Sequence, residues 1–403
     1  RFIMSEFQAS NFKKENGGAP DTTGVTNLKS PYFFVPPSGD TKSRPLNCAA
    51  GTLRFNTDFG TLEVYRGDTV GWEQIQRRDD QYLGGGLTSG SIDGTGTRAI
   101  FAGGYAPSGG TPNQTFDTVD AITVETLGNA IDFNNLSSAR VRNVGFSDAT
   151  RSFAAGGVGP VASQYSTIAN QIEFCNFSSQ NNYVDFGDLT DARGSGAGFS
   201  DKTRGVYAGG TYGYVNTIDY VTMQSAGNAV DFGDLYTNKT GENAGLQSST
   251  RGFSLGGVRY NAPDSVSFNT IQVVTIQTTG DSTDFGDMMY ANYAHAAGSN
   301  ATRGIKAGGY GPNYTTRIEY LTLSSEGNTV RFGDLTNLNG TGKQAGTSPT
   351  RFVLGGGYTS GAPFVNIMEY VQIATTGDAA DFGDLTYAKR NGSGGTSNGH
   401  GGL

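Results

Sequence analysis

Histidine, cysteine and tryptophan are scarce in this sequence, and their scarcity argues against several kinds of chemistry. The 403 residues include two histidines, two cysteines and a single tryptophan. Zinc and copper sites need several nitrogen or sulfur ligands, so we expect no metal, no cofactor and no catalytic residue, with His295 in a loop and His400 in the tail. Cys48 and Cys175 lie far apart and form no CxxC motif, so we expect two free thiols.

Charge is also sparse, and its balance is acidic. Charged residues make up 16% of the chain, and the formal net charge is −8. A nucleic-acid surface relies on clustered lysine and arginine, so we expect no nucleic-acid partner. No stretch approaches the ~18 consecutive apolar residues that cross a bilayer, and the opening "RFIMSEFQAS" lacks the apolar core of a secretory signal. We therefore expect neither membrane insertion nor a cleaved leader.

Glycine, in contrast, is abundant, and much of it belongs to an internal repeat. The chain holds 62 glycines, about twice the usual share. The stretch "TRGVYAGG" recurs as an arginine, a short apolar run and a glycine pair, at intervals of 47 to 53 residues. The arginines that open the copies are Arg98, Arg151, Arg204, Arg251, Arg303 and Arg351. Six copies of one order predict a repeat architecture.

Two further elements follow each glycine pair, and both have the pattern of β-strands. The first is a short run rich in β-branched and aromatic residues, such as "NTIDYVTMQ", and the second carries "DFGD" or a variant of it. Gly-Asn or Gly-Asp pairs between them suit tight hairpin turns. We expect the phenylalanines of the second element to be buried between adjacent sheets, each contributing about 1.5 to 3 kcal/mol. They are Phe133, Phe186, Phe232, Phe285, Phe332 and Phe382.

The glycine pair itself has a structural interpretation. A strand that ends where neighbouring sheets converge leaves no room for Cβ atoms, and glycine lets the backbones approach closely. We therefore expect the pairs at the inner edges of the sheets. A phosphate-binding loop is the functional alternative, but evenly spaced copies without a Walker lysine or a following helix argue against it.

These elements together resemble the kelch family of β-propellers. The resemblance covers residues 79–403, with phenylalanine in the fourth strand where the family usually has tryptophan. It implies an all-β fold of four-stranded blades around a central axis, although periodicity alone also allows a solenoid. The tail "YAKRNGSGGTSNGHGGL" is similar to the start of a repeat, so we expect it to close the propeller as the first strand of the blade between Arg98 and Leu136. This predicts six blades, or seven if residues 79–96 and the tail form one of their own.

The repeat also places acidic groups at a fixed position, which glutamine occupies in one copy. The acids are Asp120, Glu173, Asp219, Glu319 and Glu369, and the glutamine is Gln272. We expect these acids to pair with the repeat arginines within or between blades, rather than to form a binding ring. Such pairs fix register more than they stabilise, because desolvation offsets much of their attraction.

The first 78 residues lack the repeat and divide into two parts. Residues 1–43 have little apolar periodicity and include two adjacent prolines, so we expect an extended arm. In residues 44–78, apolar and polar residues alternate on both sides of "NTDFG", which predicts a small β-hairpin module. One face of it would carry Leu53, Phe55, Leu62 and Val64. An isolated hairpin is marginal in water, so this one should need a partner.

This module, preceded by Arg44-Pro45 and followed by the repeats, resembles virion structural proteins of marine bacteriophages that infect cyanobacteria. The resemblance implies a non-enzymatic structural component of the virion, a tail fibre or a head or tail appendage, assembled in the host cytoplasm. The arm of residues 1–43 would contact other virion proteins, and the propeller would face a host surface glycan or protein. The resemblance also implies a homo-oligomer, for which a trimer is one option.

Two other functions use the same fold. One is an intracellular kelch-type protein-interaction module, and the other is a carbohydrate-active propeller enzyme with a pair of carboxylates. The acids recur with the repeat, and the sequence has no nucleophile elbow or HExxH motif, so we expect no enzyme. The loops between the second and third strands vary most and would emerge on one face. The tyrosines predicted to face a receptor or partner there are Tyr105, Tyr165, Tyr212, Tyr260, Tyr310 and Tyr358.

Overall fold

β-Strands form nearly all the regular structure of this chain. The computed structural model describes residues 37–45, 48–58, 61–67, 71–74, 97–106, 114–159, 167–212, 215–236, 240–260, 265–338, 341–358, 364–389 and 394–403. The fold is all-β, as the sequence predicts, with one short 3-10 helix in these residues. The chain divides into two compact units, Arg1–Arg77 and Arg78–Leu403.

The first unit contains a four-stranded sheet of order β1-β2-β3-β4. Its elements are β1 (Ser38–Gly39), the 3-10 helix η1 (Thr41–Ser43), β2 (Leu53–Asn56), β3 (Thr61–Tyr65) and β4 (Trp72–Gln74). β2 and β3 form a hairpin in which Leu53 lies opposite Val64 and Phe55 lies opposite Leu62. The sheet begins at β1, inside the segment for which the sequence predicts an extended arm, and residues 1–36 of that arm lie outside the described residues.

The two faces of this sheet carry side chains of opposite kinds. Leu53 and Leu62 are 46% and 39% exposed on the face of the alternating apolar residues. The buried side chains of the opposite face include Arg54, Asn56 and Glu63. Glu63 accepts hydrogen bonds from Arg44 Nε at 3.2 Å and from Asn56 Nδ2 at 2.7 Å. The Arg44 bond is the main cause that lowers the pKa of Glu63. Much of the polar face is therefore hydrogen-bonded internally, and the apolar face is partly exposed.

The described residues of the second unit contain six four-stranded antiparallel sheets. Sheet 1 consists of β30 (Gly395–Ser397), β5 (Arg98–Ala106), β6 (Gln114–Thr123) and β7 (Ile131–Asn135). Sheet 2 consists of β8 (Val144–Ser147), β9 (Arg151–Ala155), β10 (Gln171–Asn176) and β11 (Val184–Asp188). Sheet 3 consists of β12 (Ala197–Ser200), β13 (Arg204–Ala208), β14 (Thr217–Thr222) and β15 (Val230–Asp234).

The remaining sheets repeat the same order of strands. Sheet 4 consists of β16 (Ala244–Gln247), β17 (Arg251–Leu255), β20 (Thr270–Thr275) and β21 (Thr283–Asp287). Sheet 5 consists of β22 (Ala296–Ser299), β23 (Arg303–Ala307), β24 (Arg317–Thr322) and β25 (Val330–Asp334). Sheet 6 consists of β26 (Gln344–Thr347), β27 (Arg351–Gly355), β28 (Ile367–Gln372) and β29 (Ala380–Asp384). A small hairpin of β18 (Val258–Tyr260) and β19 (Ser265–Ser267) extends from sheet 4.

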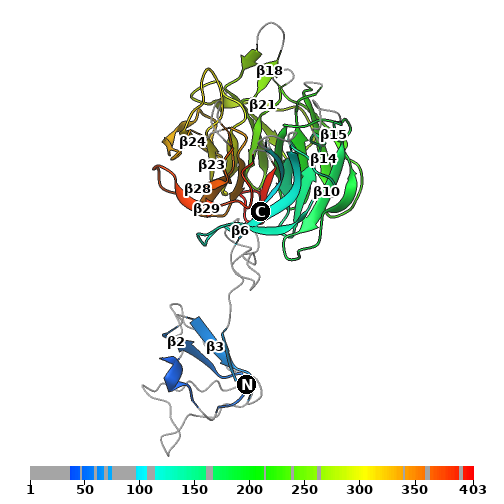
Figure 1. Cartoon of the computed structure of the whole chain (residues 1–403). Coiled ribbons are helices and arrows are strands. Elements are labelled where there is room, and N and C mark those ends of the chain that lie inside the picture. The colour runs from blue at the N-terminus through cyan, green and yellow to red at the C-terminus, as the bar shows by residue number, and fades with distance from the viewer. Residues whose placement is uncertain are drawn as a thin grey trace, which may run out of the picture. The chain divides into compact units, whose positions relative to one another are not determined.

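The sheets follow one another through their first strands. β8, β12, β16, β22 and β26 contact one another in this order, and β30 contacts both β26 and β8. β30 is the tail strand, and its Gly395 lies opposite Phe101 of β5. Figure 1 shows the strands of this unit grouped around the C-terminal end of the chain. The arrangement is consistent with a β-propeller-like fold.

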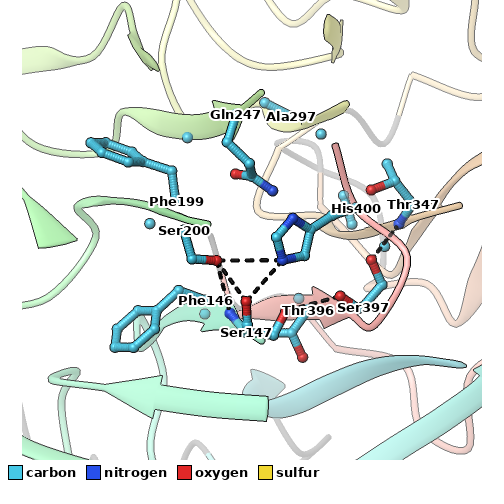
Figure 2. Close-up of a pocket in the computed structure, with 17 residues that line it drawn as sticks. Phe146, Ser147, Phe199, Ser200, Gln247, Ala297, Thr347, Thr396, Ser397 and His400 are labelled. Atoms are coloured by element: carbon cyan, nitrogen blue, oxygen red, sulfur yellow. Dashed lines mark hydrogen bonds between the residues drawn. The ribbon is translucent and has the colours of Figure 1, made fainter. Parts of the chain in front are cut away.

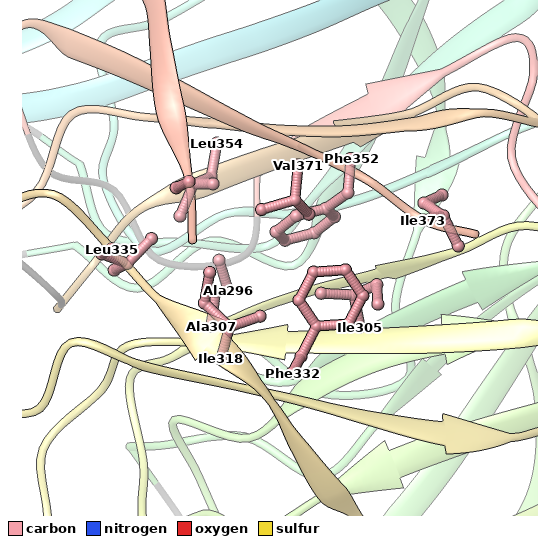
Figure 3. Close-up of a cluster of buried hydrophobic side chains, with 11 residues drawn as sticks. Ala296, Ile305, Ala307, Ile318, Phe332, Leu335, Phe352, Leu354, Val371 and Ile373 are labelled. Carbon is pink, nitrogen blue, oxygen red and sulfur yellow. The ribbon is translucent and has the colours of Figure 1, made fainter. Parts of the chain in front are cut away.

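Hydrophobic clusters fill the spaces between successive sheets. The phenylalanine of the fourth strand is buried in every sheet, with at most 4% of its surface exposed. Phe332 of sheet 5 packs in one cluster with Phe352 and Val371 of sheet 6 (Figure 3). Phe382 of sheet 6 packs in another with Phe101 of sheet 1. The last sheet therefore shares a core with the first.

The residues that line the centre are not the predicted glycine pairs. Five pairs directly follow the second strand, and the pair Gly103-Gly104 lies within β5. Both members of each pair have positive φ, as in Gly209 at 68° and Gly210 at 129°. The prediction that the pairs form the inner edges was wrong. The expected lack of room for a Cβ atom is confirmed, since one on Gly156 would collide with the carbonyl oxygen of Arg193. Single small residues of the first strands occupy those edges instead. A Cβ atom on Gly245 would collide with the carbonyl oxygen of Gly198, and one on Gly198 with that of Gly145.

Candidate functional site

The loops that follow the second strands meet the loops that precede the first strands. Isolated β-bridges join the two kinds of loop in sheets 2 to 6, for example Tyr293 with Tyr310 in sheet 5 and Thr341 with Tyr358 in sheet 6. Both kinds of loop therefore lie at the same end of the sheets, which is named the bridge end here. It contains the variable loops for which the sequence predicts receptor-facing tyrosines.

Seven aromatic rings form a continuous arc at the bridge end. Each ring contacts the next with centroids 4.7 to 6.5 Å apart, and five of the six contacts are edge to face. In order, the rings of this aromatic arc are Tyr260, Tyr293, Tyr310, Tyr314, Tyr358, Phe364 and Tyr105. They belong to sheets 4, 5, 6 and 1 and the loops beside them. Such contacts contribute about 0.5 to 1.5 kcal/mol each beyond burial, so the rings hold their loops together.

The rings of the aromatic arc are only partly covered, so part of their apolar surface faces solvent. Tyr260, at one end, is 39% exposed, and the other members are half-buried. Burial is the main cause that raises the pKa of both Tyr260 and Tyr293. Their hydroxyls stay protonated at neutral pH and can both donate and accept hydrogen bonds. A surface of this kind suits adaptable polar contacts with aromatic anchors, to a carbohydrate or a protein.

The structure brings together most of the tyrosines that the sequence singles out. The members that lie in the aromatic arc are Tyr105, Tyr260, Tyr310 and Tyr358. Tyr212 does not belong to it, and the Arg142 guanidinium lies 5.8 Å from its ring centroid. Tyr165 lies outside the described residues.

Three members of the aromatic arc were missed by the sequence reasoning. Tyr314 and Phe364 lie in the predicted loops, but not at the positions that the repeat emphasises. Tyr293 lies in a loop that precedes a first strand, and the prediction covered only loops between second and third strands. Strand direction alternates in an antiparallel sheet of four strands, so both kinds of loop must emerge at one end. That alternation is the signal that could have found Tyr293.

A chain of backbone hydrogen bonds supports the bridge end. Arg142, Ser195, Glu242 and Ala294 occupy equivalent positions and have φ between 52° and 65°. The N–H groups of Ser195, Glu242 and Ala294 each donate to the carbonyl oxygen of the preceding member, at 2.6 to 2.9 Å. Left-handed conformations at residues other than glycine cost about 1 to 3 kcal/mol each and persist only where the surroundings fix them. The short segments that precede the first strands of sheets 2 to 5 are therefore fixed by these bonds.

Buried ion pairs lie inside five of the sheets, but their cations are not the repeat arginines. Asp219 pairs with Arg193 at 2.8 Å, and both side chains are at most 1% exposed. The other pairs join Asp120 with Lys389, Glu173 with Arg140, Glu319 with Lys306 and Glu369 with Lys343. In sheet 4, Gln272 accepts a hydrogen bond from Ser282 Oγ at 2.9 Å instead. The predicted pairing of these acids with the repeat arginines was wrong, because other cations of the same sheet already neutralise them.

The repeat arginines connect successive sheets in another way. Arg351 of sheet 6 donates to the carbonyl oxygens of Val124 and Glu125 in sheet 1, at 3.1 and 2.8 Å. Equivalent bonds to the following sheet are made by Arg98, Arg204, Arg251 and Arg303. Arg151 differs, since it pairs with Asp148 of its own sheet at 2.9 Å. These arginines are structural, and the bond from Arg351 again joins the last sheet to the first.

The first strands of all six sheets line a narrow axial cavity (Figure 2). The glycines in its lining are Gly145, Gly198, Gly245, Gly298, Gly346 and Gly395. Its volume of about 40 Å³ holds a few water molecules at most. His400 lines one end, and His295 lines a second cavity of similar volume between the same strands. Both histidines are buried. The sequence placed them in a loop and in the tail, and these places did not predict burial.

The described residues do not meet the requirements of a metal site. In this part of the chain, no group of three or more histidine, cysteine, aspartate or glutamate side chains is arranged to hold a metal ion. Cys48 and Cys175 are both free, as expected. No helix within the described ranges has the length and apolar character to span a membrane.

No protein-family model matches the sequence, and no curated protein matches it.

Proposed function

We propose that this chain is a non-enzymatic structural component of a bacteriophage virion, which displays a kelch-like six-bladed β-propeller for attachment to a host surface. Three observations support the closed ring of six blades. They are the six sheets of one strand order, the core shared by sheets 6 and 1, and a cavity lined by the first strands of every sheet. The virion role rests on the resemblance of the hairpin module and the repeats.

The aromatic arc is the observation that carries the display role. It is a surface of partly exposed aromatic rings at one end of the sheets, and each ring contacts the next. Rings that already pack against one another lose little conformational entropy when they bind a partner. The open apolar face of the first unit, with Leu53 and Leu62, supports attachment of that unit to other virion proteins.

The first experiment asks whether the protein belongs to particles. Phage particles purified from a lysate are analysed by quantitative mass spectrometry, and the proposal predicts a fixed number of copies per particle. Removing residues 1–78 should leave a folded, soluble second unit that is absent from particles, because the attachment surface is gone. A protein that is found in the host cytoplasm and never in particles would instead indicate an intracellular interaction module.

The second experiment tests the aromatic arc on assembled particles. Replacing Tyr293 and Tyr358 by alanine should lower the rate of adsorption to host cells by about tenfold or more, since central aromatic contacts each contribute about 2 kcal/mol or more at interfaces. Tyr236→Ala is the matched control, because Tyr236 is 66% exposed and belongs to no ring contact of the arc. Adsorption that is unchanged in the double variant, at normal particle composition, would contradict the display role.

A further inference from the structure

The last six residues, 398–403, fill one end of the axial cavity, and they are named the tail plug here. All six are buried. Asn398 N donates to Arg98 O of sheet 1 at 3.1 Å, and Gly401 N donates to Ser299 O of sheet 5 at 2.9 Å. His400 Nε2 lies 2.9 Å from Ser147 O of sheet 2. The tail plug therefore continues beyond β30 and crosses from one side of the unit to the other.

The fit of the tail plug leaves no space for side chains at Gly401 and Gly402. A Cβ atom on Gly401 would lie 2.7 Å from Gln247 O of sheet 4 and would collide with Asn300 O of sheet 5. One on Gly402 would collide with Ser200 O of sheet 3. The segment thus has the shape of the socket that the first strands form around it, and it is not a loosely packed end.

His400 can occupy this socket in only one protonation state. Its Nε2 donates to Ser147 O at 2.9 Å, and its Nδ1 accepts the N–H of Gly402 at 3.1 Å. These partners assign the neutral tautomer with the proton on Nε2. A second proton on Nδ1 would face the N–H of Gly402 and remove that bond. Figure 2 shows the ring directed at Ser147 and Ser200 across the end of the cavity.

The surroundings of His400 give little support to a positive charge. The side chain is 4% exposed, and burial lowers its pKa to about 4. The hydrogen bond with Ser147 O and the charges of two carboxylates, Asp148 after β8 and Asp201 after β12, act in the opposite direction, but burial outweighs them. The neighbours from the other sheets in the cavity lining, such as Gln247 and Thr347, are neutral.

We propose that the tail plug is an acid-sensitive closure of the axial cavity, in which a proton on His400 Nδ1 releases residues 398–403 while β30 stays paired with β5. The device is independent of the virion role proposed above. When released, His400 has an ordinary pKa of about 6.5. Because its pKa in the closed state is lower, closure is strongest above about pH 6.5 and weakens as the pH falls from there toward 4. Between pH 7.5 and 4.5 the released population should rise on the order of 10- to 100-fold.

Hydrogen exchange of the full chain tests this device. Exchange of the peptide covering residues 395–403 is followed by mass spectrometry, and each rate is divided by the intrinsic rate at that pH. The protection of the Gly401 and Leu403 amides should fall 10- to 100-fold from pH 7.5 to 4.5, while β12 and β13 remain protected. His400→Gln can still donate to Ser147 O but does not titrate, so its protection should be the same at both pH values.

His295→Gln is the matched control, because His295 is the other histidine of the chain and also lines the space between the first strands. This variant should keep the wild-type response. Equal protection of the wild-type tail at both pH values would overturn the proposal, and so would a wild-type response in His400→Gln. If His400→Gln is unprotected at both pH values, the double variant Asp148→Asn/Asp201→Asn decides. Retention of the response there supports His400 as the titrating group, and its loss overturns that assignment.

Discussion

At the scale of single residues, each repeat has two sites where small residues matter, the glycine pair and the inner position of the first strand, and the sequence makes only the pair conspicuous. The glycine pair recurs with little variation, so it attracts attention, but its role is a turn with positive φ. The inner position of the first strand is glycine or alanine and stands in an inconspicuous stretch such as "AGLQ". The packing of sheets from distant copies of the repeat decides which of these small residues lines the centre. The spacing of residues in the sequence does not show this packing.

A substitution at the inner position tests this assignment. In Gly245→Ala, the new Cβ atom meets the carbonyl oxygen of Gly198, so the first strands must move apart. We expect a loss of about 1 to 3 kcal/mol in the free energy of unfolding, the range typical of overpacking, measured by urea denaturation. Sheet 5 provides the control, because Ala297 is the equivalent residue there. Ala297→Gly should change stability less, and equal losses in the two variants would contradict the crowding.

At this scale, the partners in the buried ion pairs also could not be predicted from the sequence. The acids could be recognised by their recurrence, but their partners come from loops or neighbouring strands whose positions depend on the folded sheet. Asp219→Ala should lower the free energy of unfolding by about 3 to 5 kcal/mol, because Arg193 is left charged and buried. The double variant Asp219→Leu/Arg193→Met should recover most of this loss. If the double variant is as unstable as the single one, the stability at Asp219 and Arg193 depends on the shape of the side chains and not on their charge.

At the scale of elements, the sequence predicted the strands well and the irregularities poorly. The arginine runs, the β-branched runs and the phenylalanine motifs correspond to the second, third and fourth strands. The pairing of β14 with β15, however, skips Phe232, since Ile218 lies opposite Gly233 and Asp219 opposite Asp231. This β-bulge points the phenylalanine into the space between sheets. A bulge depends on how two strands pair. The motif "DFGD" therefore indicated a buried aromatic residue, but not that this residue is skipped in the pairing of the strands.

The tail strand is the element on which the proposed closure of the ring depends. Its likeness to the start of a repeat predicted a first strand, and β30 occupies that place beside β5. Ending the chain before Tyr387 should expose the edge of β5 and empty the end of the axial cavity. We expect the melting temperature to fall by about 10 °C, since each kcal/mol is worth about 2 to 4 °C in a unit of this size. Restoration by a peptide of residues 387–403 would assign the loss to this strand, and an unchanged melting curve would refute closure by the tail.

At the scale of the whole molecule, the repeats determine the frame and the variable loops determine the surface. Like-sized sheets with buried aromatic residues between them form the support for the loops. The aromatic arc then depends on residues that differ from copy to copy, such as Tyr293 and Phe364. The repeats in the sequence reveal the frame of sheets directly. The aromatic arc appears only when loops from sheets 4, 5, 6 and 1 are brought together in space.

The most direct test of this account is a density map of the second unit, obtained by crystallography or electron cryomicroscopy. The account predicts six four-stranded sheets around an axis, with β30 paired to β5, Arg351 in contact with sheet 1 and His400 at the end of the axial cavity. A seventh sheet, or an open row of sheets in which the tail pairs elsewhere, would contradict it.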